Sequence, residues 1–138
     1  MLDDYAWELY NAHRFAEAVR LSDRSVGLFA QSDDEVGYGK ALVRQSRHRY
    51  MAGDTEDAIV SANAGAVVLC TADRPDASAF AMTNLGSLLA LGGEPTRAAA
   101  VLDEAARLAD SGGRPDLVDL CLNYQSIARP GLDRKSVV

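Results

Sequence analysis

The 138-residue sequence contains very little cysteine and histidine. Cys70 and Cys121 are too few for a disulfide framework, and we interpret them as free thiols in a reducing cytoplasm. His13 and His48 lie far from each other and from both cysteines, without the short spacing of paired metal ligands. No nucleophile, base and orienting group can be assembled, so the sequence predicts a non-catalytic protein without metal or cofactor.

The sequence also lacks a long apolar run and a surplus of basic residues. No apolar stretch approaches the length of a membrane span, and the acidic start Met1-Leu2-Asp3-Asp4 lacks the basic and apolar regions of a signal peptide. The formal net charge of −6 argues against a general nucleic-acid binder. We therefore expect a cytoplasmic protein that contacts neither membranes nor nucleic acid directly.

The clearest structural signal is a helix–turn–helix pattern between Thr83 and Ala109. Apolar residues recur there at spacings of three and four, as on one face of an α-helix. Gly92-Gly93 interrupts the pattern, because glycine adopts the positive φ that helix ends favour, and Pro95 suits the first turn of the next helix. The stretch predicts an antiparallel helical hairpin.

Similar features recur at an offset of 40 residues, which indicates stacked supersecondary units. Arg74-Pro75-Asp76 aligns with Arg114-Pro115-Asp116, and Tyr10 with Tyr50. Two columns of small residues share this offset: Ala18, Ala58 and Ala98, and Ala6, Ser46, Gly86 and Ser126.

The chain resembles the tetratricopeptide repeat family over about residues 1 to 128. The segment from Ala52 to Ile59 fits the family's turn, and the longer 40-residue unit is closer to the repeats of bacterial regulators than to the standard 34. The resemblance implies an all-α fold, a right-handed superhelical stack of antiparallel hairpins with about seven helices. The best-matching packing residues are Leu85, Gly86, Leu89, Gly93, Ala98, Leu102 and Ala105.

In chain order we expect three hairpins and a final capping helix within residues 1–128, followed by a tail at 129–138. The first hairpin is predicted from helices at about 2–12 and 15–30. Because the first helix begins without a capping sequence, the sequence also predicts a homodimer or a longer native chain.

A basic stripe on the helix predicted from about Glu35 to Ala52 stands out from the acidic chain. Lys40, Arg44 and Arg47 occupy positions i, i+4 and i+7, and therefore share one face. One interpretation is an ordinary solvated helix face whose positive charges are balanced by the acidic residues 33–35. The other interpretation is a binding surface.

The family resemblance favours the second interpretation, because first helices of its repeats line a concave groove. In some family members, lysine, arginine and asparagine at such positions clamp a peptide's terminal carboxylate, and Lys40, Arg44 and Asn84 match part of that clamp. The implied groove residues are Lys40, Arg44, Arg47 and Met51, then Phe80, Thr83, Asn84 and Ser87, and in the first unit Asp3, Asp4, Trp7 and Asn11.

The sequence thus predicts a non-catalytic protein- or peptide-binding module, with acidic segments or C-terminal carboxylates as the expected ligands. Two alternatives stay open. One is a ligand- or peptide-sensing domain of a bacterial transcriptional regulator, and the other is a self-associating scaffold.

Overall fold

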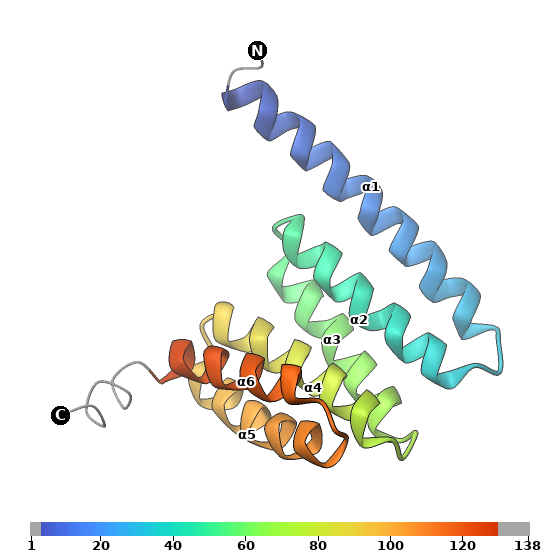
Figure 1. The fold of residues 1–138 in the computed structure, drawn as a ribbon. Coiled ribbons are helices and arrows are strands. Elements are labelled where there is room, and N and C mark those ends of the chain that lie inside the picture. Colours follow the sequence, from blue (N-terminus) through green and yellow to red (C-terminus); the bar gives the residue numbers. More distant parts are fainter. Residues whose placement is uncertain (1–3, 130–138) are drawn as a thin grey trace.

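The computed structural model describes residues 4–129, with the side chains of residue 8 and residues 10–129. Within this range the chain forms six α-helices and no strand, which confirms the all-α prediction. Each helix packs against its neighbours in the chain, and α4 also contacts α2 and α6 (Figure 1). The helices are α1 (Asp4–Ala30), α2 (Glu35–Met51), α3 (Thr55–Cys70), α4 (Pro75–Leu91), α5 (Pro95–Ser111) and α6 (Pro115–Ala128).

Helix boundaries after α1 follow local sequence signals. The Asp34 side chain caps α2 by accepting a hydrogen bond of 2.9 Å from the backbone N–H of Gly37, and Asp54 caps α3 in the same way. Helices α4, α5 and α6 each begin with proline in the first turn. In the turn before α5, Gly93 has φ of +83°, which glycine adopts without strain. The predicted hairpin between Thr83 and Ala109 is therefore present as α4 and α5.

The predicted first hairpin is wrong. Residues 4–30 form one continuous 27-residue helix, without the break expected near His13. The reason is local, because residues 10–16 contain neither glycine nor proline, whereas each turn after α2 carries one or both at the turn or in the first position of the next helix. The described chain thus has two hairpins, α2 with α3 and α4 with α5, flanked by the single helices α1 and α6. Of the predicted tail, all but Arg129 lies outside the described residues.

Small residues let the helices approach closely. Ala58 and Ala98, aligned by the 40-residue offset, are both fully buried. A Cβ atom on Gly86 would lie 2.6 Å from Cγ and Cδ2 of the fully buried Leu102, so α4 and α5 meet where glycine leaves room. The buried core between the helices consists mainly of leucine and alanine, with Val43 and Cys121.

Helix α1 makes a set of polar contacts with α2. Ser22, the one buried side chain described on α1, hydrogen-bonds to His48 of α2. Asp23 accepts hydrogen bonds from Gln45 at 2.7 Å and from Arg49 at 3.3 Å. Ser61 of α3 donates to Gln45 at 2.8 Å and so extends the network across three helices. Large apolar side chains on α1, such as Leu28, remain exposed.

The two cysteines are expected to differ strongly in reactivity. Cys70 is exposed, whereas Cys121 of α6 is fully buried next to Thr83 of α4, and burial raises the pKa of the Cys121 thiol. Iodoacetamide should therefore modify Cys70 alone in the native protein and both thiols in denaturant, as measured by peptide mass spectrometry. Modification of native Cys121 at the rate of Cys70 would contradict the packing of α6 on α4.

Candidate functional site

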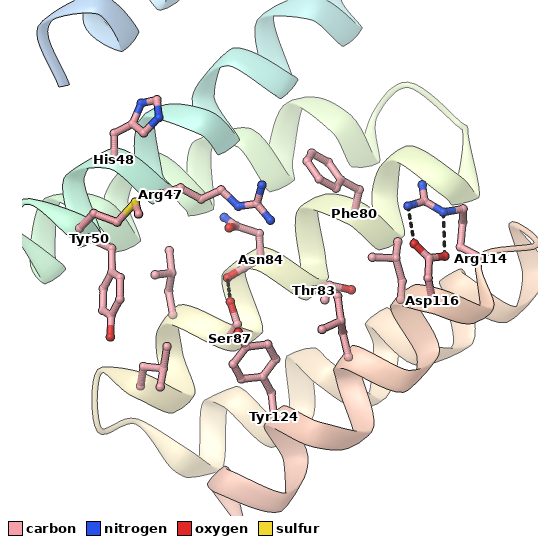
Figure 2. A pocket seen from close by; sticks show the side chains of 15 residues that line it. Arg47, His48, Tyr50, Phe80, Thr83, Asn84, Ser87, Arg114, Asp116 and Tyr124 are labelled. Carbon is pink, nitrogen blue, oxygen red and sulfur yellow. Dashed lines mark hydrogen bonds and ion pairs between the residues drawn. The ribbon is translucent and has the colours of Figure 1, made fainter. Parts of the chain in front are cut away.

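A groove runs along the face formed by α2, α4 and α6, which run in the same direction in the stack (Figure 1). Its main cavity has a volume of about 630 Å³ and draws its walls from all three helices. Figure 2 shows the side chains that converge on it. The predicted groove residues that line this cavity are Arg47, Met51, Phe80, Thr83, Asn84 and Ser87.

A second cavity of about 390 Å³ adjoins the first, and it contains the rest of the basic stripe. Lys40 and Arg44 of α2 line the second cavity and not the first, whereas Arg47, Phe80 and Arg114 line both. We call the second cavity, with Lys40, Arg44 and Arg47, the cationic end of the groove. Because three residues are shared, the two cavities form one continuous surface.

The cations of the stripe carry uncompensated charge. The ion pairs formed within residues 4–129 include none of Lys40, Arg44 and Arg47. The neighbouring Asp34 could have formed an ion pair with one of these cations, but its carboxylate instead caps α2. All three cationic side chains are exposed, so an anion in solution can reach them.

Arg47 lies over the ring of Phe80, with 5.8 Å between its guanidinium carbon and the ring centroid. The negative face of an aromatic ring attracts a cation and gives a flat guanidinium a preferred orientation. Phe80 belongs to α4 and Arg47 to α2, so this contact spans the groove floor between two helices. The contact brings the basic stripe next to the predicted residues of α4.

Other charges around the groove are already paired. Hydrogen bonds of 3.0 and 2.8 Å from Arg114 to Asp116 lower the pKa of the Asp116 carboxyl and raise the pKa of Arg114 (Figure 2). Arg74 donates to Asp76 at 3.1 Å and lowers the pKa of that carboxyl. Both carboxylates therefore stay ionised at neutral pH, and each balances the positive charge of the arginine that donates to it. The surplus positive charge comes from the basic stripe.

Asn84 connects helices within the groove floor. It is 7% exposed, and its Nδ2 donates to Ser46 Oγ of α2 at 2.9 Å. Ser46 Oγ in turn donates to the carbonyl of Val43 at 2.6 Å. One amide hydrogen of Asn84 is thus committed to helix packing, so the residue helps to hold α2 against α4 as well as lining the cavity.

The opposite end of the groove is apolar. Met51 and Leu91 are 55% and 45% exposed at the C-terminal ends of α2 and α4, and Tyr124 of α6 lines the same cavity. We call the part formed by Tyr50, Met51, Leu91, Leu120 and Tyr124 the apolar end. The groove therefore changes along its length from cationic to apolar.

The sequence prediction missed the contribution of α6. Arg114, Asp116, Leu117, Leu120 and Tyr124 all line the main cavity, as do His48, Tyr50, Leu88 and Leu91. A signal was available, because Leu120 and Tyr124 lie 40 residues after Phe80 and Asn84. Extending the repeat register by one more unit would have placed them in the groove.

The predicted groove residues of the first unit are not brought to this site. Asn11 is half-buried on α1 and lines neither cavity. The side chains of Trp7 and Asp4, and all of Asp3, lie outside what the structure describes. Because α1 is a single helix, the register that was to place Asn11 in the groove does not apply.

Comparison with known proteins adds no further assignment. No protein-family model, curated protein or solved structure matches the chain.

Proposed function

We propose that this chain is a non-catalytic binding module that holds an acidic segment of a partner protein in the groove between α2, α4 and α6. One observation carries the proposal. Lys40, Arg44 and Arg47 line the groove without an acidic partner in residues 4–129, in a chain whose net charge is −6.

Electrostatics supports binding of an acidic ligand at this place. Cations gathered in a concave surface focus the local potential, so an acidic segment is attracted despite the net negative charge of the whole molecule. Carboxylates of the segment would accept charge-assisted hydrogen bonds from the arginines. The contact of Arg47 with Phe80 supports the proposal further, because it reduces the freedom that the guanidinium loses on binding.

The apolar end of the groove favours a ligand segment that carries apolar as well as acidic side chains. Exposed Met51, Leu91 and Leu120 offer a surface for an apolar side chain next to the acidic group. The resemblance to tetratricopeptide repeats supports the same reading, since the groove lies on helices that match the first helices of those repeats.

Replacing Lys40, Arg44 and Arg47 together with alanine tests the proposal. We expect the parent protein to retain members of an acidic peptide library, with retention falling as salt rises from about 50 to about 500 mM. The triple variant should retain none, as measured by quantitative mass spectrometry of the eluted peptides.

Arg107→Ala is the matched control, because Arg107 lies on α5 beside Glu104 and lines neither cavity. It should retain the same peptides as the parent. Equal retention by the triple variant would reject the groove as the binding site.

A further inference from the structure

We infer that the cationic end of the groove recognises a phosphorylated serine or threonine side chain, presented by a segment that continues toward the apolar end. This inference rests on the proposed function and adds the chemical class of the group that is bound. It follows from the amount of uncompensated charge, from the donors available and from the connection between the two cavities.

The charge at the cationic end exceeds what one carboxylate would neutralise. Lys40, Arg44 and Arg47 contribute three positive charges without an ion-pair partner in the described part of the chain. Asp76 is the acidic side chain among the residues lining this cavity, and its pair with Arg74 offsets its charge. A phosphate monoester carries about −1.5 to −2 at neutral pH and therefore matches this surplus better than a single carboxylate does.

The donors also suit a phosphate. Positions 40, 44 and 47 share one face of α2, and all three residues line the same cavity of about 390 Å³. Guanidinium groups bind phosphate oxygens through two parallel N–H bonds, and the lysine ammonium adds a point charge. Across the cavity, Arg114 uses Nε and Nη2 for Asp116, which leaves Nη1 without a hydrogen-bond partner within the described residues.

The helix N-termini contribute little to this site. Asp76 and Asp116 occupy the first turns of α4 and α6, where their negative charges already compensate the positive ends of the helix dipoles. Recognition therefore depends on side-chain cations from α2. This dependence makes the inference testable by substitution.

The shape of the groove indicates that the phosphate is attached to a peptide. The cationic cavity opens into the larger cavity through Arg47, Phe80 and Arg114, which line both. A peptide with its phosphorylated residue near Arg44 would continue along α4 toward Leu120 and Tyr124. We therefore expect an apolar residue close to the phosphorylated one in the preferred segment.

Three degenerate peptide libraries, identical except for a fixed central phosphoserine, glutamate or serine, test the inference with the full chain. We expect the phosphoserine library to be retained at least about tenfold more than the glutamate library, because a phosphate offers more charge and more acceptor oxygens. Inorganic phosphate should compete for retention, and sequencing of the retained pool should show apolar residues near the phosphoserine.

Arg44→Gln should remove the preference for phosphoserine, and Arg107→Gln, the same change on α5, should preserve it. Equal retention of the glutamate and phosphoserine libraries, both above the serine library, would overturn the phosphate inference and leave the acidic-segment proposal standing. Equal retention of all three libraries would overturn both. Retention of none of the libraries by a folded protein would overturn both. An unchanged phosphoserine preference in folded Arg44→Gln would place recognition elsewhere and overturn the inference.

Discussion

Replacing Gly86 with leucine is expected to destabilise the protein by roughly 1–3 kcal/mol, because it overpacks the contact between α4 and α5. Even a single Cβ atom at position 86 would lie 2.6 Å from Leu102, whose side chain is fully buried in a core that close packing leaves little room to rearrange. The change should lower the free energy of unfolding measured by urea titration followed by circular dichroism at 222 nm.

Gly27 provides the matched control, since it is an exposed helical glycine on α1 with nothing within 4 Å of a built Cβ. Gly27→Ala should stabilise the protein by about 0.5–1 kcal/mol, because alanine loses less backbone entropy in a helix. Gly86→Ala should not show this gain, as the clash opposes it. An unfolding free energy unchanged by Gly86→Leu would show that α4 and α5 do not pack at this glycine.

Reversing the charge of Arg44 is expected to abolish binding of acidic segments without unfolding the protein. Arg44→Glu removes one of three uncompensated cations and places an anion beside the other two, so it both weakens the attraction and adds repulsion. Hydrogen bonds to charged groups contribute about 1.5–3 kcal/mol each, which corresponds to at least a tenfold loss in affinity. Fluorescence anisotropy with a labelled acidic peptide would measure the loss.

Two controls separate this effect from general damage. The helical circular dichroism signal should stay unchanged, because Arg44 is exposed and forms no ion pair within residues 4–129. A peptide whose acidic residue is replaced by lysine should bind Arg44→Glu better than it binds the parent. Parent-like affinity of Arg44→Glu for the acidic peptide would mean that the basic stripe is only a solvated helix face.

Much of the local structure was predictable from neighbouring residues. The α4–α5 hairpin follows from Gly92-Gly93 and Pro95. Glycine widens and proline narrows the range of backbone conformations, and both effects are independent of the tertiary structure. The prediction was wrong near His13, where the expected break depended on the repeat register and no glycine or proline interrupts the helix. Prediction from sequence succeeded where a turn had its own chemical signal and was wrong where it was inferred by analogy.

The basic stripe was also determined by sequence, since residues four and three apart lie on one face of any α-helix. What surrounds that stripe was decided by the tertiary structure. The contact of Arg47 with Phe80, the bond from Asn84 to Ser46 and the apolar wall from α6 join residues more than 30 positions apart. Helical periodicity specifies which residues share a face, but only the packing of whole helices determines which faces meet and which charges are left without a partner.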